Sequence, residues 1–271
     1  ALSYCPKTHL IFDYFNGLQH LQNRQVVFIN QAEERIKEDY LRILRFFRFS
    51  AYYANEFDSI GTLACAKHAK NLTSLSRERI NTEFDKILSS PKAIETLKTM
   101  SVKILDNLFP GIITSIEKLQ HGLTLAESFK IGLDIDFRYA LLFLQNTKLN
   151  FPSLKFSKKR SKIIAQAIAL TNPSEHDNIE FILKKFWLQG YLPSQFTILA
   201  TSLDKLKVNM AQELIHMFAQ NPPKFILNGE QIKKMGYNGK NIGLVLNYLE
   251  KIWIEKNFCI SAAQLLKFLD K

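Results

Sequence analysis

Residues 38–49 read EDYLRILRFFRF and carry side chains suited to recognising a nucleobase. On a helix, Asp39 and Arg42 are one turn apart and project from the same face. A carboxylate accepts a hydrogen bond from the exocyclic amine of cytosine or adenine, and the guanidinium donates to the neighbouring ring nitrogen or carbonyl. Guanine and uracil present the wrong donors to this pair. The same spacing is also typical of a solvated helix face with ordinary ion pairs, so both interpretations stay open.

An amphipathic helix over residues 31–49 is expected to position these groups. Its apolar stripe has the period of a half-buried helix and comprises Ile36, Tyr40, Ile43, Leu44 and Phe47. The opposite, charged face comprises Arg35, Glu38, Asp39, Arg42 and Arg45. Upstream, the runs HLIFD and QVVFI flank the turn FNG and predict two short strands. Most of the remaining sequence is expected to be helical, with breaks at Ser, Pro and Gly.

Three segments resemble a known family in the same order along the chain. They are FDYFNGLQHLQNR at 12–24, QAEERIKEDYLRILRFFRF at 31–49 and SRERINTEFDKILSSPKAIETL at 76–97. They are similar to the motifs that join the catalytic head and the neck of the class II nucleotidyltransferases, the family of CCA-adding enzymes and bacterial poly(A) polymerases. One departure is His20, where the family usually carries Asp. Two long motifs in the right order make the resemblance specific.

The resemblance implies roles for individual residues. Asp39, Arg42 and Arg45 match the positions that template the incoming nucleotide, and Glu38 is expected to orient one of the arginines. Arg79 and Glu83 are expected to support the template helix from the second motif. The substrates implied are ATP and CTP, the acceptor is the 3′ end of a tRNA or another RNA, and the metal is Mg2+.

In the family, this metal is bound at a glycine-serine turn and at a strand with an Asp-x-Asp pair. Both motifs precede the segments that this sequence matches. We therefore expect a fragment that lacks most of the catalytic head, is inactive by itself and contains no catalytic or metal-binding residue. Asp134 and Asp136 spell Asp-x-Asp, but they precede a periodic run, and we interpret Asp136 as a helix N-cap. His176 and Asp177 form an isolated dyad, which is too few ligands for a hydrolytic metal site.

Composition narrows the class of protein without identifying it. The 271 residues carry a net charge of +11, which favours an anionic partner such as RNA. The cysteines at 5, 65 and 259 are odd in number and far apart, so a disulfide framework is not indicated and a reducing cytoplasm is the expected location. No apolar run approaches the length of a membrane span.

Two further segments are candidates for RNA contact. The cluster LKFSKKRSK places Lys158, Lys159 and Arg160 at the start of a predicted helix, where they either bind phosphates or form a solvated face. Gly236 and Gly239 form a turn before another helix, whose amides could bind a phosphate. The alternative is a turn that only needs positive φ.

Side chains further along that last helix have structural interpretations. We expect Gly243 to permit close packing. Trp253, Tyr248 and Leu249 are expected in the core.

The predicted fold is mainly α, with a multi-helical neck, body and tail and a short β-hairpin remnant of the α/β head at the N-terminus. The predicted domains are 1–30 (end of the head), 31–105 (nucleotide-selecting neck), 106–152 (body) and 153–271 (body and tail, RNA-binding). The favoured function is RNA 3′-terminal nucleotidyl transfer, foremost CCA addition to tRNA. The alternatives are poly(A) addition, a noncatalytic RNA-binding remnant or subunit, and an interaction scaffold without an RNA role.

Overall fold

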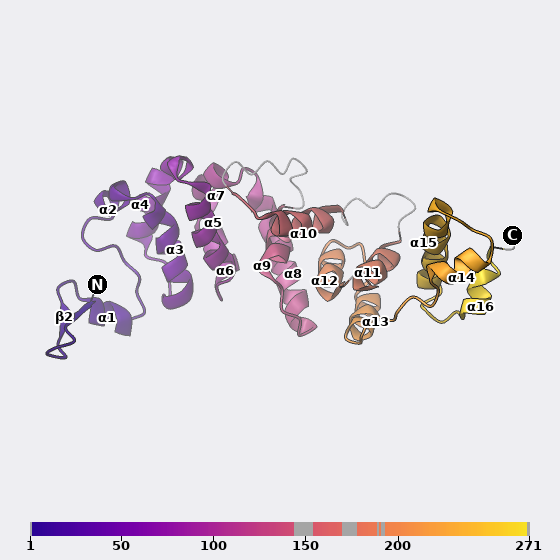
Figure 1. Cartoon of the computed structure of the whole chain (residues 1–271). Coiled ribbons are helices and arrows are strands. Elements are labelled where there is room, and N and C mark those ends of the chain that lie inside the picture. The colour runs from indigo at the N-terminus through magenta and orange to yellow at the C-terminus, as the bar shows by residue number, and fades with distance from the viewer. Residues whose placement is uncertain (1, 144–153, 170–177, 189, 191–192, 270–271) are drawn as a thin grey trace. The chain divides into compact units, whose positions relative to one another are not determined.

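The computed structural model describes residues 2–143, 154–169, 178–188, 190 and 193–269. Within these ranges the chain is mainly helical and holds one two-stranded antiparallel sheet, which confirms the predicted fold class (Figure 1). The chain divides into two compact units, each described by itself. Unit 1 comprises Ala1–Thr124 and Leu133–Ile168, and unit 2 comprises Leu125–Gly132 and Ala169–Lys271. The boundaries predicted for the head, neck, body and tail stay predictions.

The N-terminal sheet pairs β1 (Leu2–Tyr4) with β2 (Ile11–Asp13). The hairpin is thus present, but the prediction that strands flank the turn FNG is wrong. Gly17 instead begins helix α1 (Gly17–Gln22), because the Asp13 carboxylate accepts hydrogen bonds from the amides of Gly17 at 2.6 Å and Leu18 at 2.9 Å. These contacts occupy amides that a starting helix leaves unpaired, and the run QVVFI that follows has no regular secondary structure.

The segment 31–49 is two helices rather than the single helix that its periodicity predicts. Helix α2 (Ala32–Glu38) ends because Asp39 is extended, with φ −157° and ψ 108°, and helix α3 (Leu41–Tyr53) begins two residues later. The Asp39 carboxylate accepts a hydrogen bond from the Leu41 amide at 3.1 Å. Asx side chains compete in this way for backbone donors and favour helix starts. Asp39 therefore does not share a helix face with Arg42.

The predicted apolar stripe is nevertheless largely correct. Ile36, Ile43, Leu44 and Phe47 are fully buried, and Tyr40, at the break, is half-buried against the ring of His68. The apolar side chains on both sides of the break are thus buried, although the helix itself is interrupted.

The rest of unit 1 is built from short helices around α3 and α5, which pack against each other (Figure 1). Their core includes a cluster of aromatic rings in which Phe84 lies 4.5 Å from Phe109 and 6.0 Å from Tyr139, between ring centroids. Helix α8 crosses the division between the two units. The other elements that begin in unit 1 are α4 (Ser59–His68), the 3-10 helix η1 (Ala69–Ser74), α5 (Arg77–Leu88), α6 (Ala93–Thr99), α7 (Ser101–Leu108), the 3-10 helix η2 (Ile112–Ser115), α8 (Ile116–Ser128), α9 (Ile135–Phe143) and α10 (Lys158–Ala169).

Unit 2 has six helices in its described part, and its C-terminal helices enclose a core of their own. That core packs around Trp253, which is 1% exposed, with Leu249 and Ile232 beside it. The helices are α11 (Ile179–Leu188), α12 (Pro193–Ser202), α13 (Val208–Phe218), α14 (Gly229–Lys234), α15 (Lys240–Glu255) and α16 (Ala262–Leu266). Over the described ranges of the chain, no helix combines the length and apolar character needed to cross a membrane.

Candidate functional site

Asp39 is held by groups from two elements at the break between α2 and α3. Its Oδ1 accepts from the Leu41 amide, and its Oδ2 pairs with Arg79 Nη2 of α5 at 2.7 Å. Both side chains keep access to solvent, with 29% of Asp39 and 47% of Arg79 exposed. The carboxylate therefore has a fixed direction and retains lone pairs for an additional donor. The predicted supporting residue Arg79 contacts the predicted base-reading residue directly.

Arg42 is oriented by α2. Its Nη1 donates to the backbone oxygen of Arg35 at 2.8 Å and pairs with the Glu38 carboxylate. Glu38 also accepts from Arg35 Nη1, at 2.8 and 2.9 Å. The Arg42 hydrogen bond, followed by that of Arg35, lowers the pKa of the Glu38 carboxyl. Glu38 thus stays ionised between two arginines, and the Nε and Nη2 donors of Arg42 make no hydrogen bond within the described residues.

A groove of about 370 Å3 lies beside these residues. Three guanidinium groups line it, those of Arg35, Arg42 and Arg45, and the side chain of Arg45 is exposed without a hydrogen bond or ion pair inside the described part of unit 1. Arginine forks match phosphate oxygens, and the apolar wall suits a base or ribose. Asp39 and Glu38 do not line this groove. The residues that line it are Val26, Val27, Phe28, Ile29, Arg35, Arg42, Arg45, Phe46 and Phe49.

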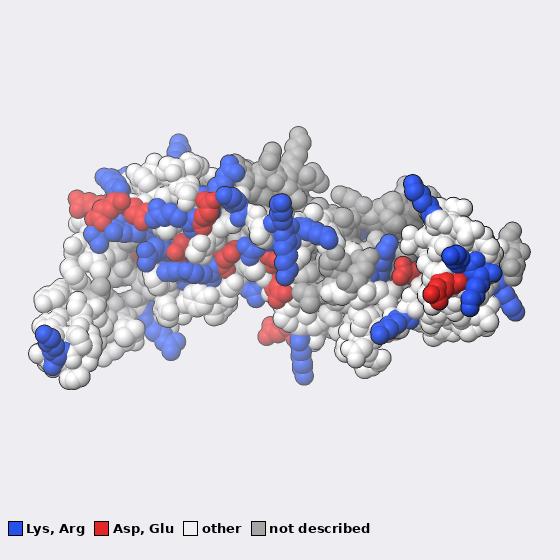
Figure 2. Space-filling model, viewed as in Figure 1, with Lys and Arg blue, Asp and Glu red and all other residues white. Residues whose placement is uncertain are grey.

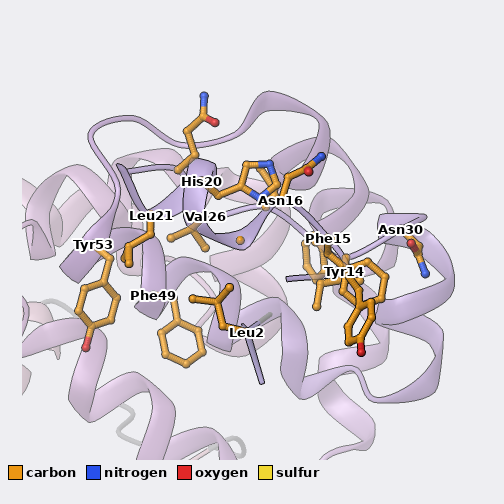
Figure 3. Close-up of a pocket in the computed structure, with 15 residues that line it drawn as sticks. Leu2, Tyr14, Phe15, Asn16, His20, Leu21, Val26, Asn30, Phe49 and Tyr53 are labelled. Atoms are coloured by element: carbon orange, nitrogen blue, oxygen red, sulfur yellow. The ribbon is translucent and has the colours of Figure 1, made fainter. Parts of the chain in front are cut away.

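The segment Val26–Ile29, which lines this groove and has no regular secondary structure, also borders a second cavity of about 650 Å3. Figure 3 shows it surrounded by Leu2 from β1, His20 and Leu21 from α1, and Phe49 and Tyr53 from α3. Phe49 lines both spaces. The sequence predicts a strand at QVVFI and a helix through Phe49, but it does not indicate that either lines a pocket, because a short apolar run does not show which space it will border.

Glu83 is a buried anchor between α5 and α3. Its carboxylate pairs with Arg48 Nη1 at 3.1 Å, and the two side chains are only 9% and 14% exposed. Arg48 also lies over the ring of Phe49, 4.2 Å from the ring centre. Glu83 therefore contacts α3 on its core side. This places it beside the helix it was expected to support, and its functional role stays a prediction.

The basic cluster at α10 separates into two kinds of residue. Lys158 and Lys159 are exposed, and neither makes an ion pair or hydrogen bond within the described part of unit 1. Arg160 instead pairs with Asp85 Oδ2 at 2.9 Å and with Asp136, beneath the rings of Tyr139 and Phe156. Its guanidinium is thus used inside the protein.

Lysine and arginine side chains are spread over the visible face of both units, interspersed with acidic ones (Figure 2). Lys158 and Lys159 are the members of the α10 cluster that present free charge to a partner.

Within the described ranges, the acidic residues that the sequence analysis considered do not form a magnesium site. Asp136 is not the expected helix cap, because α9 begins at Ile135, the Asp134 backbone oxygen accepts the first helical bonds, and the Asp136 side chain pairs with Arg160. Over the described ranges there is no group of three His, Cys, Asp or Glu side chains able to hold a metal. His176 and Asp177 lie outside those ranges.

The C-terminal turn has the backbone that its glycines predict. Gly236 and Gly239 have φ of 94° and 58°, in the region that favours glycine, so the need for positive φ is met and the phosphate contact stays a prediction.

Two expectations for α15 are wrong and two are correct. No atom lies within 4 Å of a Cβ built on Gly243, so this residue does not permit packing within the described chain. Tyr248 is 49% exposed rather than part of the core. The reason is helical phase, since only one face of α15 meets the core, and that face carries the buried side chains of Leu249 and Trp253.

The sequence matches known proteins along most of its length. Residues 62–115 match the family described as "Probable RNA and SrmB- binding site of polymerase A". The chain is 28% identical over 283 residues to the mitochondrial CCA tRNA nucleotidyltransferase 1 of Mus musculus, covering 96% of this chain and 62% of that protein. It is 30% identical over 262 residues to the CCA-adding enzyme of Streptococcus sanguinis (strain SK36), covering 89% of this chain and 62% of that protein.

Solved structures share the fold. The Bacillus stearothermophilus CCA-adding enzyme in complex with CTP has a TM-score of 0.69 at 19% identity, covering 94% of this chain and 67% of that one. The Thermotoga maritima CCA-adding enzyme complexed with tRNA has a TM-score of 0.67 at 16% identity, covering 99% and 70%. The chain spans about 62% of the length of the curated relatives it matches. The shared motifs, the RNA-binding segment and these relatives together show that the chain belongs to the family of class II CCA-adding enzymes and bacterial poly(A) polymerases.

Proposed function

We propose that this protein serves RNA 3′-terminal nucleotidyl transfer, and specifically the addition of CMP and AMP from CTP and ATP during CCA addition to tRNA. The observation that carries the proposal is the pair of held groups at the α2–α3 break. Asp39 is fixed by Arg79, and Arg42 is fixed by Glu38 and the Arg35 carbonyl, beside a groove lined by arginines. Relatives named as CCA-adding enzymes support the same reading.

In this proposal the protein itself is the template for the base. Asp39 accepts a hydrogen bond from the exocyclic amine of cytosine or adenine, and Arg42 donates through its free Nε or Nη2 to the adjacent ring acceptor. Arg45, which has no partner in the described part of unit 1, braces the nucleotide from the groove. Small reorientations of the Asp39 and Arg42 side chains would then switch the site from C to A, as the resemblance implies.

Supporting roles follow from the contacts. Arg79 positions Asp39, Glu38 positions Arg42, and Glu83 fixes α3 against α5. Lys158 and Lys159 contact RNA phosphates, together with the turn at Gly236 and Gly239. Arg160, which the sequence analysis considers for RNA contact, is assigned instead to two ion pairs inside the protein, with Asp85 and with Asp136.

Mg2+ supplies charge neutralisation and hydroxyl activation in reactions of this type. The described residues do not include a group of ligands for it. We propose that residues 1–271 recognise substrates and do not by themselves catalyse transfer. The location we propose is the reducing cytoplasm, consistent with three free cysteines, although several relatives are named mitochondrial.

Poly(A) addition is the second candidate, because the matching family description names polymerase A. The two candidates differ in the product. A tRNA lacking its terminal CCA should receive two C residues and one A if the first is correct, whereas a run of A would support the second.

The test of base selection is Arg42→Ala in the catalytically complete protein. We expect the preference for CTP and ATP over UTP and GTP to fall by about ten- to hundredfold, because one two-donor contact to a base is worth roughly 1–3 kcal/mol of discrimination. The measurement is single-nucleotide incorporation with each triphosphate.

Arg77→Ala is the matched control, since Arg77 is exposed on α5 and does not line the groove. Selectivity that survives Arg42→Ala would refute the templating role. Nucleotide addition by residues 1–271 alone would refute the assignment of the metal ligands elsewhere.

A further inference from the structure

His68, the last residue of α4, contacts both sides of the break between α2 and α3. On the side of α2, its Nε2 lies 3.6 Å from Glu33 Oε2. On the side of α3, its ring lies 6.4 Å from the ring of Tyr40, between ring centroids. Tyr40 directly follows Asp39, the carboxylate to which we assign base reading. One imidazole therefore contacts α2 and also the residue next to the reading group.

The Nε2 atom of His68 is buried and makes no hydrogen bond within the described residues. A buried polar atom without a partner costs free energy, so its presence needs an explanation. The nearby Glu33 carboxylate lies beyond hydrogen-bond distance, because it already accepts from Lys67 Nζ at 2.8 Å on each of its oxygens. Two adjacent residues of α4 are thus potential partners for a single carboxylate of α2.

The charge of the imidazole decides how this carboxylate is shared. Histidine is the side chain that ordinarily changes its charge between about pH 5 and 8. A neutral His68 leaves Glu33 to Lys67. A protonated His68 is a half-buried cation, and pairing with Glu33 offsets the cost of its burial. Glu33 is ionised throughout this range, because the hydrogen bond from Lys67 lowers the pKa of its carboxyl.

Other charged groups around His68 do not take the place of Glu33. Helix α7 packs against α4 and η1, and α2 packs against α4. None of the other charged residues of α2 and α7 makes an ion pair with His68 within the described residues; these are Glu34, Arg35, Lys37, Glu38, Lys103 and Asp106. In the described part of unit 1, Glu33 is therefore the counter-ion that a protonated His68 can reach.

We propose that His68 is a positioning residue for Asp39, and that it makes base selection depend on pH. When protonated, His68 pairs with Glu33 and holds α2 against α4, while its ring stays beside Tyr40. Because α2 ends at the residue before Asp39, this contact fixes the break from one side, as Arg79 of α5 fixes it from the other. When His68 is neutral, Asp39 has more orientations. The inference rests on the proposed function, because it names how selection at that site is regulated.

The first test uses the whole 271-residue chain and the NMR signal of the Leu41 amide, which donates to Asp39 Oδ1 at the break. In the unaltered chain this signal should shift between about pH 5 and 8, in step with the ring signal of His68. In His68→Phe it should stay constant over the same range, because phenylalanine keeps a flat ring beside Tyr40 but takes no proton. A role in packing alone would not produce a pH-dependent shift.

Glu33→Gln tests the same contact from α2. The Glu33 side chain is 42% exposed, so we expect this change to leave the fold intact. His68 still takes up a proton in this variant but has no carboxylate to pair with. The pH-dependent shift of Leu41 should therefore be lost while the His68 ring signal still titrates. This variant gives the same comparison if His68→Phe does not fold.

The second test measures selection in the catalytically complete protein, as the ratio of CTP to UTP incorporation. The two triphosphates carry the same phosphates, so titration of the phosphates cancels in this ratio. The unaltered protein should be about two- to fivefold more selective at pH 6 than at pH 8, the effect of one partly exposed ion pair. His68→Phe should be equally selective at both values.

His121→Phe is the matched control. His121 is a histidine exposed on α8, and it makes no ion pair with α2 in the described part of unit 1. It should leave both the Leu41 shift and the pH dependence of selection unchanged.

The outcomes separate this inference from the proposed function. If Leu41 shifts equally with pH in the unaltered chain and in His68→Phe, His68 does not position the break and the inference fails, while the function stands. The same holds if the CTP to UTP ratio of the unaltered protein is independent of pH. If Arg42→Ala leaves selectivity intact, the templating function fails, and the regulation of selection by His68 fails with it.

Discussion

At the scale of single residues, the candidate site depends on carboxylates that already accept hydrogen bonds from other residues of the protein. Asp39 accepts from Leu41 and Arg79, and Glu38 accepts from Arg35 and Arg42. These contacts are partly exposed, so their contribution to folding stability is small. Their main effect is on the orientation of the side chains. They reduce the number of orientations that Asp39 and Arg42 can adopt before a base arrives, which is what selection between similar bases requires.

Asp13 gives a prediction for pH. Hydrogen bonds from the Leu18 and Gly17 amides lower the pKa of its carboxyl. A carboxyl with a lowered pKa in the folded state stabilises that state above its unfolded pKa and loses the effect as the pH falls. We therefore expect the start of α1 to loosen as the pH drops below about 4.

The measurement is amide hydrogen exchange at Gly17 and Leu18 as a function of pH, after correction for intrinsic exchange. Asp13→Asn is the control, because the neutral amide should show weak protection without this pH dependence. Unchanged protection of both amides in the unaltered protein at pH 3 would contradict the capping role.

At the scale of elements, α3 is positioned by α5 through two ion pairs of different character. Asp39–Arg79 is at the exposed start of α3, and Arg48–Glu83 is near its buried middle. Because Arg79 and Glu83 are four residues apart on α5, one face of that helix contacts both. The first pair orients the Asp39 carboxylate, and the second fixes helix α3, which carries Arg42.

The buried pair gives a prediction for stability. Arg48→Met should lower the free energy of unfolding by about 3 kcal/mol, because it leaves the Glu83 carboxylate buried without its partner. Chemical denaturation monitored by circular dichroism measures the change.

Lys155→Met is the control of the same kind at an exposed pair. Lys155 and Glu78 are 69% and 61% exposed, so losing this pair should change stability far less than Arg48→Met does. Equal effects of the two changes would show that burial does not distinguish them.

At the scale of the whole molecule, the net charge of +11 comes from positive side chains in different surroundings. Lys158 and Lys159 are exposed and make no ion pair with the described residues of unit 1, whereas Arg160, the next residue, pairs with Asp85 and Asp136. Neighbouring positive residues thus serve two purposes, and net charge alone does not distinguish them.

This division predicts opposite effects for adjacent substitutions. Lys159→Ala should leave stability unchanged and lower the salt slope of RNA binding by about one. Arg160→Ala should lower the free energy of unfolding by about 2–4 kcal/mol, because two carboxylates lose their cation in a part-buried cluster. Denaturation and salt-dependent binding to tRNA are the two measurements. A loss of RNA affinity for Arg160→Ala with no change in stability would reverse the assignment.

The sequence predicted features that depend on pattern. The mainly helical fold, the buried face with Ile43 and Phe47 and the core position of Trp253 all follow from helical periodicity, because each repeats a burial requirement along the chain. The sequence motifs were also sufficient to identify the family, because their order and spacing are properties of the sequence itself.

Only the tertiary structure decided how those elements begin and where their side chains are used. The break at Asp39 depends on a carboxylate that competes for the Leu41 amide and finds Arg79 forty positions away. Arg160 is internal because Asp85 and Asp136 come from other helices, and the open space at Gly243 is known only once the neighbours of α15 are placed. Periodicity specifies which face of a helix is buried, but the partner of a charged side chain is set by contacts distant in sequence, and these exist only in the folded chain.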